Sequence, residues 1–326
     1  MSAPEIRIDQ LTGLRTILAP GRAERPEGFV AASSGSTDPA ECPFCEGHEG
    51  RTPPEVYATR PGGGEANTPG WTTRVVPNLY PALAAGEEDD RVPPELFVSR
   101  AAAGAHEVIV HAPEHVTAMA DLSEEQFAAA VATWRERMRV HSDAPYTQLI
   151  VNEGDGAGAS LPHTHAQLYA LPFVPATVAR ERERAGAYRE STGGGSLLGD
   201  VLVEEVRRRE RLVAIDEEAA LICPWASRSP FELRVVPRRE AARFEDDDAG
   251  AAMIHTALRA LAARFDGPPE LNLWVRTAPR GAEHFHWHVD IAPRLSVKAA
   301  FEFATGVDIN IYAPERAAAD LREALG

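Results

Sequence analysis

Two histidines and a glutamine alternate along one short segment, LPHTHAQLYALP at residues 161–172. If this segment is a β-strand, His163, His165 and Gln167 face one side of it, and the residues between them face the other. An imidazole on such a face can bind a metal, transfer a proton or attack phosphorus. A solvated strand with two ordinary histidines would show the same alternation, so the surrounding residues must decide between these interpretations.

A glycine-rich segment, GDGAGAS at residues 154–160, directly precedes the histidines. Glycines allow the backbone to come close to an anion, and the side chains of Ser160 and Gln167 can donate uncharged hydrogen bonds to phosphate oxygens. A histidine whose second ring nitrogen keeps its proton can attack phosphorus and hold a nucleotidyl group as a phosphoramidate. These residues favour the hypothesis of nucleotidyl transfer through His165.

The cysteines suggest a metal site. Cys42 and Cys45 form a Cys-Pro-Phe-Cys pair, which is typical either of a redox dithiol or of half a tetrahedral zinc site. The acidic flanking residues and the lack of a helix-start pattern favour zinc. The remaining ligands would come from the eleven histidines, among which His115 and His163 stand out, and a site with four protein ligands would be structural. Cys223 lies in an apolar run and is expected in the core.

The composition excludes several classes of partner. A formal net charge of −16 argues against binding nucleic acid or an anionic membrane surface, because phosphate groups are held mainly by basic clusters. Small phosphorylated ligands remain possible, and arginine would bind them, because Lys298 is the one lysine of the sequence. The sequence shows neither a long apolar run nor a signal peptide pattern, so we expect a cytoplasmic protein.

An internal repeat indicates which elements position these side chains. The first copy reads HEVIVHAPEH, DLSEEQFAAAVATWRERM and YTQLIVNEGDGAGASLPHTHAQLYALP, and the second reads FELRVVPRRE, FEDDDAGAAMIHTALRALAARF and ELNLWVRTAPRGAEHFHWHVDIAPR. Each copy predicts a strand, a helix, a strand, a loop and a histidine-rich strand, so the chain is a duplicated α+β unit. We expect domains at residues 1–185 and 195–326, with the Gly/Ser-rich stretch 189–200 as loop or linker.

The two predicted helices have recognisable starts. Ser123 and Gln126 suggest a capping box, and the acidic residues 245–248 suggest the first turn of the second helix. In the first helix, apolar residues recur at helical spacing and are expected to pack in the core: Phe127, Val131, Trp134 and Met138.

Taken together, these motifs resemble the galactose-1-phosphate uridylyltransferase branch of the histidine-triad superfamily. The resemblance covers nearly the whole chain, since RIDQLTGLRTILAPGRAERP and VVPNLYPAL also look like that branch's N-terminal strand and base-binding segment. It implies an α+β fold of two tandem histidine-triad-like units, in which helices pack on antiparallel sheets. It also implies a homodimer, because each active site in the family borrows residues from its partner.

The resemblance implies a role for each matching residue. His165 would be the nucleophile and Gln167 a donor to the bound phosphate, with Asn152 and Ser160 beside it. The matches to the family's zinc positions are Cys42, Cys45, His115 and His163. The matches to its substrate-binding positions are Arg22 and Arg25 near the phosphates, reached from the partner subunit, Asn78 in the nucleoside loop, and Glu302 at the sugar.

The sequence departs from the family's pattern at two places. Some members hold a second metal, iron, with a glutamate and three histidines; Glu181, His286 and His288 match three of these ligands, but Arg276 stands in the fourth position. A cation there would repel a metal, so we expect this site to be empty or weak. In the sugar site, Asp308 falls where a glutamine is expected, and this region looks closer to the branch that includes ADP-glucose phosphorylase.

The sequence therefore predicts a ping-pong nucleotidyltransferase that acts on a nucleotide sugar and a sugar 1-phosphate or phosphate. UDP-glucose–hexose-1-phosphate uridylyltransferase is the first hypothesis and ADP-sugar phosphorylase the alternative, because neither the base nor the sugar can be read from these motifs. A dinucleoside polyphosphate or phosphoramidate hydrolase is less favoured, because Gln167 stands where the hydrolases have a third histidine. A zinc-stabilised nucleotide-binding protein without turnover is the non-enzymatic alternative.

Overall fold

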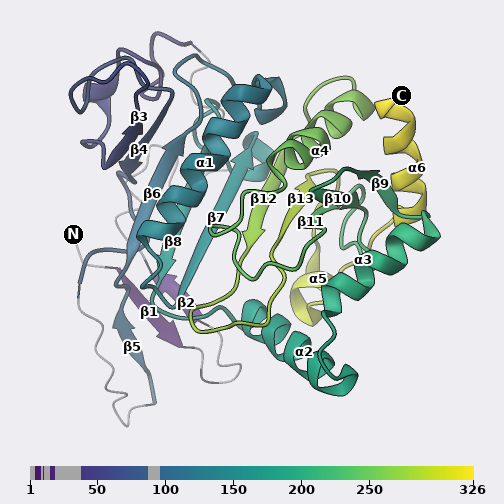
Figure 1. Cartoon of the computed structure of the whole chain (residues 1–326). Helices are drawn as coiled ribbons and strands as arrows, with labels where there is room; N and C mark the ends of the chain where they lie inside the picture. The colour runs from purple at the N-terminus through teal and green to yellow at the C-terminus, as the bar shows by residue number, and fades with distance from the viewer. Residues whose placement is uncertain (1–3, 9, 11–14, 19–37, 87–95) are drawn as a thin grey trace.

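The structure is a computed structural model, and it describes residues 4–8, 10, 15–18, 38–86 and 96–326. Its centre is a ten-stranded antiparallel sheet with the strand order β3-β4-β6-β8-β7-β12-β13-β11-β10-β9 (Figure 1). The strands in sequence order are β3 (Tyr57–Thr59), β4 (Thr73–Pro77), β6 (Ala105–Val110), β7 (Tyr146–Glu153), β8 (His165–Leu171), β9 (Leu212–Ile215), β10 (Ala219–Ile222), β11 (Leu233–Pro237), β12 (Leu271–Arg276) and β13 (His288–Pro293). A separate antiparallel sheet has the order β2-β1-β5 and consists of β1 (Glu5–Ile8), β2 (Arg15–Leu18) and β5 (Ser99–Ala101).

Six α-helices complete the described fold: α1 (Glu124–Val140), α2 (Ala176–Thr192), α3 (Leu197–Arg208), α4 (Ala251–Arg264), α5 (Ala300–Thr305) and α6 (Pro314–Leu325). In the part of the chain that the structure describes, three short 3-10 helices lie in the loops: η2 (Glu49–Arg51), η3 (Met119–Asp121) and η4 (Asp155–Ala157). Among the described residues, no helix combines the length and apolar character needed to cross a bilayer.

The predicted repeat is confirmed. The first copy forms β6, α1, β7 and β8, and the second forms β11, α4, β12 and β13. Within the sheet these copies give the orders β6-β8-β7 and β11-β13-β12, so the histidine-rich strand is central in each. The two copies join where β7 pairs with β12, for example Asn152 with Asn272. The predicted α+β fold with antiparallel sheets and packed helices is also confirmed.

Helices α1 and α4 lie side by side on one face of the sheet (Figure 1). The predicted apolar stripe of α1 is buried between this helix and the strands, with Phe127, Val131, Trp134 and Met138 at most 1% exposed. Ala166 and Leu168 of β8 belong to the same core. Because side chains alternate along a strand, His165 and Gln167 point to the opposite face. The strand begins at His165, and His163 lies in the turn before it.

Several local expectations are corrected. Ser123 does cap α1, but the Gln126 side chain donates to the carbonyl oxygens of Thr72 and His111 instead of closing a capping box. The acidic residues 245–248 lie before α4, which begins after Gly250, because Asp247 accepts a hydrogen bond from the Trp287 indole. The expected linker 189–200 is mostly helical, since α2 runs to Thr192 and α3 begins after Ser196.

Candidate functional site

Four side chains from three separate segments converge on one point. The ligand atoms of Cys42, Cys45, His115 and His163 all lie within 4.8 Å of one another. The Cys42 sulfur is 3.5 Å from His163 Nδ1, and the Cys45 sulfur is 3.3 Å from His115 Nδ1 and 3.7 Å from His163 Nδ1. Zinc bonds of normal length at tetrahedral angles would separate sulfur from nitrogen by about 3.6 Å. The donor set therefore fits a closed tetrahedral metal site.

The surroundings of this cluster prepare its atoms to bind a metal. The Nε2–H of His163 donates to the carbonyl oxygen of Ala112 at 2.9 Å, which leaves the Nδ1 lone pair facing the sulfurs. Burial lowers the pKa of His163 to about 4, so its ring is neutral. Burial and the neighbouring Cys42 raise the pKa of the Cys45 thiol to about 12, an effect that a cation between the sulfurs would reverse.

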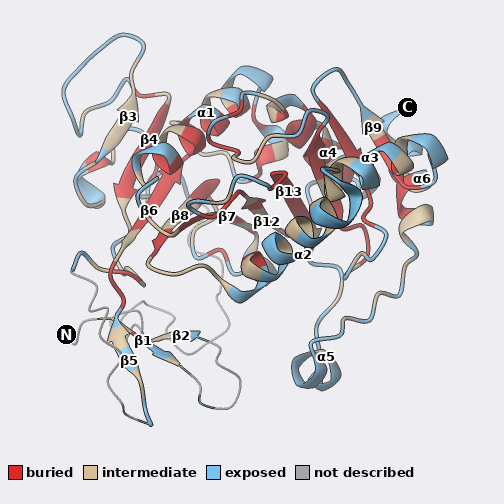
Figure 2. Ribbon diagram, turned by 60° about the horizontal axis from the view of Figure 1, so that its bottom comes forward, coloured by how far each residue is buried: buried red, intermediate tan, exposed pale blue. Residues whose placement is uncertain are grey.

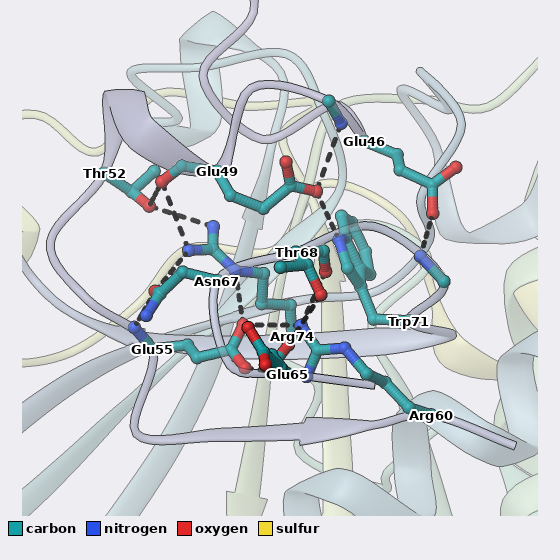
Figure 3. Close-up of polar contacts among 12 residues, drawn as sticks. Glu46, Glu49, Thr52, Glu55, Arg60, Glu65, Asn67, Thr68, Trp71 and Arg74 are labelled. Atoms are coloured by element: carbon teal, nitrogen blue, oxygen red, sulfur yellow. Dashed lines mark hydrogen bonds and ion pairs between the residues drawn. The ribbon is translucent and has the colours of Figure 1, made fainter. Parts of the chain in front are cut away.

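A buried polar network holds the loop that follows the cysteines (Figure 3). The Glu49 carboxylate accepts hydrogen bonds from the Trp71 indole at 2.8 Å and from the Gly47 backbone at 3.1 Å. Burial would raise the pKa of Glu49, but these hydrogen bonds lower it overall. The carboxylate is therefore ionised, and it ties the loop to the segment that leads into β4.

Arg74 is the centre of the same network and is 1% exposed. Its Nε donates to Glu55 at 2.9 Å, and a second nitrogen donates to Thr52 at 2.9 Å (Figure 3). Arg60 binds Glu55 with two hydrogen bonds, of 2.7 and 2.9 Å. Burial would raise the pKa of Glu55, but both arginines lower it, so the buried charges are compensated.

His165 is 5% exposed and is held in one orientation. Its Nδ1–H donates to the carbonyl oxygen of His163 at 2.8 Å, so the lone pair of the neutral ring is on Nε2. The Phe44 ring, between the two cysteines, contacts His165 edge-on with 5.2 Å between ring centres. The metal cluster and His165 are therefore coupled both through the backbone of His163 and through Phe44.

Buried His111 contacts the segment between His163 and His165. The Trp134 indole donates to His111 Nε2 at 3.0 Å, so the proton of His111 is on Nδ1, which is 3.0 Å from the Thr164 hydroxyl. Burial, followed by the charges of His165 and His163, lowers the pKa of His111 well below its ordinary value. His111 is thus neutral and holds Thr164, the residue between the two histidines.

The Gln167 side chain lies among aromatic residues. Its oxygen is 3.0 Å from His106 Nε2 and accepts a hydrogen bond from the Tyr169 hydroxyl at 3.0 Å. Asn78 lies in the turn after β4, where its side-chain oxygen accepts from the Tyr80 backbone at 2.9 Å and its nitrogen is 3.2 Å from His106 Nε2. The structure therefore brings Asn78 and Gln167 to the same histidine.

The glycine-rich loop differs from the expected loop, in which the backbone approaches a bound anion. At Gly154 and Gly156, the group that approaches the backbone is the Glu270 side chain, which a Cβ at either position would overlap. The Gly156 N–H donates to Glu270 at 3.1 Å. The Asn152 oxygen accepts a hydrogen bond from Asn272 at 2.9 Å. Ser160 is exposed, at the end of this loop.

Other predicted site residues lie elsewhere. Glu302 is on α5 and accepts from the Ala299 backbone at 2.9 Å. Helix α5 stands away from β8 in both overall views (Figures 1 and 2). Within one chain, Glu302 and His165 are therefore not brought together. Arg22 and Arg25 lie outside the described residues.

The second histidine pair lies beside a cavity of about 440 Å³. Glu181 is 3.6 Å from His288 Nδ1 and 4.0 Å from Arg276 Nε. The Nε2–H of His286 donates to the Pro237 carbonyl oxygen at 2.9 Å. The Arg276 guanidinium thus lies beside the Glu181 carboxylate, which a metal in this position would need as a ligand.

The site also contains four residues that its sequence motifs do not include: Phe44, His106, His111 and Tyr169. The strand pattern could have identified His106. It lies two residues before Val108 on β6, so both side chains face the same side of the sheet, and Val108 pairs with Gln167. No sequence pattern could have identified Phe44 or His111, since their importance depends on contacts with distant segments.

The chain is similar to known proteins over nearly its whole length. A family model described as "Galactose-1-phosphate uridyl transferase, N-terminal domain" matches residues 1–175. ADP-glucose phosphorylase of Arabidopsis thaliana is 30% identical over 338 residues, which cover 98% of this chain and 93% of that protein. Galactose-1-phosphate uridylyltransferase of Thermotoga maritima is 27% identical over 344 residues, which cover 98% of each. The crystal structure of an Arabidopsis thaliana ADP-glucose phosphorylase with bound ADP-glucose aligns with a TM-score of 0.74 and 27% identity, over 98% of this chain and 99% of that one. The similarity therefore extends over the whole fold.

Proposed function

Because the chain belongs to the galactose-1-phosphate uridylyltransferase family, we propose that it transfers a nucleoside monophosphate from a nucleotide sugar to a sugar 1-phosphate or phosphate through a covalent nucleotidyl-His165. The observation that carries this proposal is the orientation of His165. Its Nδ1–H is engaged by the His163 carbonyl oxygen at 2.8 Å, which makes Nε2 the nucleophilic nitrogen.

The reaction has two displacements at the same phosphorus. Nε2 of His165 attacks the α-phosphorus of the nucleotide sugar, the bond from that phosphorus to the bridging oxygen breaks, and sugar 1-phosphate leaves. A phosphate oxygen of the acceptor then attacks the phosphorus, the P–N bond breaks, and His165 returns to its neutral form. A phosphate is a good leaving group, so catalysis rests on positioning and on neutralising charge.

We assign the stabilisation of the negative charge to uncharged hydrogen-bond donors and to arginines. Gln167 and Ser160 would donate to the phosphate oxygens, with Asn152 beside them, and Asn78 would contact the nucleoside. Arg22 and Arg25 would contribute positive charge. Preorganised donors of this kind act most strongly on charge that develops in the transition state.

We also propose that Cys42, Cys45, His115 and His163 hold a structural zinc ion. The sulfur–nitrogen distances of 3.3 to 3.7 Å support this assignment, as does the Nε2–H of His163 on a backbone carbonyl. Zinc would fix the Cys42–Cys45 loop, and thus Phe44 and His165, without contacting substrate. Two thiolate ligands suit a reducing compartment, in accord with the predicted cytoplasmic location.

Two donors are favoured by specific observations. UDP-glucose is the first candidate, because the matching family model and the Thermotoga maritima relative carry the uridylyltransferase name. ADP-glucose is the second, because the Arabidopsis thaliana relative at 30% identity is named ADP-glucose phosphorylase.

The test is to incubate the protein with UDP-glucose or with ADP-glucose, without acceptor, and to record its intact mass under non-acidic conditions. A uridylyl adduct that is lost in His165→Ala supports the uridylyltransferase, and an adenylyl adduct supports the ADP-sugar enzyme. His284→Ala, at a histidine outside the site, is the matched control and should keep the adduct. No adduct with either donor would contradict covalent catalysis by His165 and favour a hydrolase or a binding protein.

We further propose a homodimer in which α5 reaches the partner's active site. The segment from Leu295 to Ile311 exposes several large apolar side chains, including Val297 at 89% and Phe303 at 77%, and α5 projects from the body of the chain (Figure 2). Burial of this surface against a second copy would place Glu302 within reach of a sugar there. Light scattering after size-exclusion chromatography should give twice the chain mass; an active monomer would contradict the proposal.

A further inference from the structure

Three side chains form a small cluster on the site face of β6 and β8. Gln167 and Tyr169 belong to β8, and His106 pairs directly with Tyr169 across the sheet. We propose that His106 and Tyr169 are positioning residues that orient the Gln167 amide, so that its NH₂ group is presented to the phosphate at His165. This inference rests on the proposed function.

The protonation of His106 follows from its neighbours. The Ala82 backbone N–H donates to His106 Nδ1 at 3.1 Å, so this nitrogen carries a lone pair. The proton of the neutral ring is therefore on Nε2, which lies 3.0 Å from the Gln167 side-chain oxygen. The Asn78 side-chain nitrogen is 3.2 Å from the same Nε2, but both atoms carry hydrogens, so the acceptor for the Nε2–H is Gln167.

Tyr169 strengthens the same orientation. Its hydroxyl donates to the Gln167 oxygen at 3.0 Å, so one amide oxygen accepts from both His106 and Tyr169. If the amide were reversed, its NH₂ group would face the Nε2–H of His106 and that hydrogen bond could not form, while the Tyr169 hydroxyl would have to accept instead of donate. The oxygen is thus held at the aromatic pair, and the NH₂ group is directed away from it.

The aromatic pair is itself rigid. The rings of His106 and Tyr169 stack with 4.1 Å between their centres and 22° between their planes. His106 is 4% exposed, and its backbone carbonyl accepts from the Asn78 N–H at 2.8 Å. The pair can therefore fix the Gln167 side chain before substrate binds, which avoids reorientation during the reaction.

The orientation matters because a phosphate carries only acceptor oxygens. With the NH₂ group presented, Gln167 stabilises the negative charge that is spread over the phosphoryl oxygens in the transition state. With the oxygen presented, it would repel that charge. His106 and Tyr169 would then affect the rate only through Gln167, and this dependence can be measured.

The experiment measures the rate of nucleotidyl-protein formation in a single turnover, with UDP-glucose and with ADP-glucose as donors. We expect Gln167→Ala to lower this rate about 100-fold, and His106→Leu and Tyr169→Phe about tenfold each. In the Gln167→Ala background, adding His106→Leu or Tyr169→Phe should change the rate by less than about twofold, because the three residues act as a unit. His106→Gln keeps an N–H donor and should recover most of the rate.

Tyr188→Phe is the matched control. This variant also removes one tyrosine hydroxyl. The hydroxyl of Tyr188, on α2, donates to Asp200, on α3, at 2.8 Å. Its removal should leave the rate unchanged. The inference would be overturned if His106→Leu and Tyr169→Phe lowered the rate by the same factor in the Gln167→Ala background as in the wild type. It would also be overturned if neither variant lowered the rate of the wild type. A failure of His106→Gln to recover the rate would overturn it as well. A wild-type protein that forms no adduct would instead overturn the proposed function, and the inference with it.

Discussion

Glu153, the last residue of β7, is a buried carboxyl group with incomplete hydrogen bonding. It is 6% exposed, and its Oε2 accepts the Met119 backbone N–H at 2.8 Å. Its Oε1 has no hydrogen-bond partner among the described residues. Burial raises the pKa of Glu153 to about 8, against the opposing effect of the Met119 bond. The folded protein therefore holds a proton here at neutral pH.

This proton makes stability depend on pH in a defined direction. The ordinary pKa of the group is 4.5, so the unfolded chain releases the proton first as pH rises, and the folded state loses stability between pH 4.5 and about 8. Each pH unit costs about 1.4 kcal/mol, which gives a total of about 5 kcal/mol. For a chain of this length, that corresponds to a change of about 7 °C in melting temperature.

The perturbation is Glu153→Gln, which keeps the shape and the acceptor but cannot ionise. Urea unfolding between about pH 5 and pH 8.5 should show the variant gaining stability relative to the wild type as pH rises, by several kcal/mol. Glu125→Gln, at an exposed residue of α1, is the control and should follow the wild-type curve. Parallel curves for Glu153→Gln and the wild type would refute the reasoning, because they would mean that the folded protein leaves this carboxyl group solvated or paired.

Three further predictions concern the framework of the site. Cys45→Ser should abolish stoichiometric zinc binding, measured by elemental analysis of purified protein, and lower the melting temperature; retained zinc would contradict the ligand assignment. Arg74→Met should lower the free energy of unfolding by about 1 to 3 kcal/mol, because buried Glu55 loses one of its two arginine partners and keeps only Arg60; urea unfolding measures this, and an unchanged free energy of unfolding would contradict the expected role of Arg74. Gly154→Ala should cost about 1 to 3 kcal/mol, because φ at this residue is 86° and a Cβ would overlap Glu270. Glu270→Ala should recover only the part due to overlap, so full recovery would refute the contribution of the backbone conformation.

The sequence was most informative where the chain is periodic. Alternation along residues 165–168 predicted which side chains of β8 share a face, and the helical spacing from Phe127 to Met138 predicted a buried stripe, because both patterns depend only on local geometry. The repeat likewise predicted the order of elements in both halves.

What the sequence did not reveal depends on contacts between distant segments. Nothing near Gly154 indicates that Glu270 fills the space beside it, and no local rule directs the Gln126 amide to carbonyl groups of other segments. The convergence of Cys42 with His163, which are 121 residues apart, was predicted only through the family resemblance, because no local pattern links the two residues. Periodicity identifies the buried face of an element, but it does not specify the element that covers that face.

The pairing of β7 with β12 has a consequence for attempts to divide the protein. These strands are central in the sheet, and each has its other edge already paired, β7 with β8 and β12 with β13. Expressing either half alone would turn one of them into an exposed edge with a row of open N–H and C=O groups. Such edges template pairing between chains, so the separate halves should aggregate or reassemble with each other. Co-expressed fragments would then associate through this strand pairing and through the contact between α1 and α4, without an engineered tag.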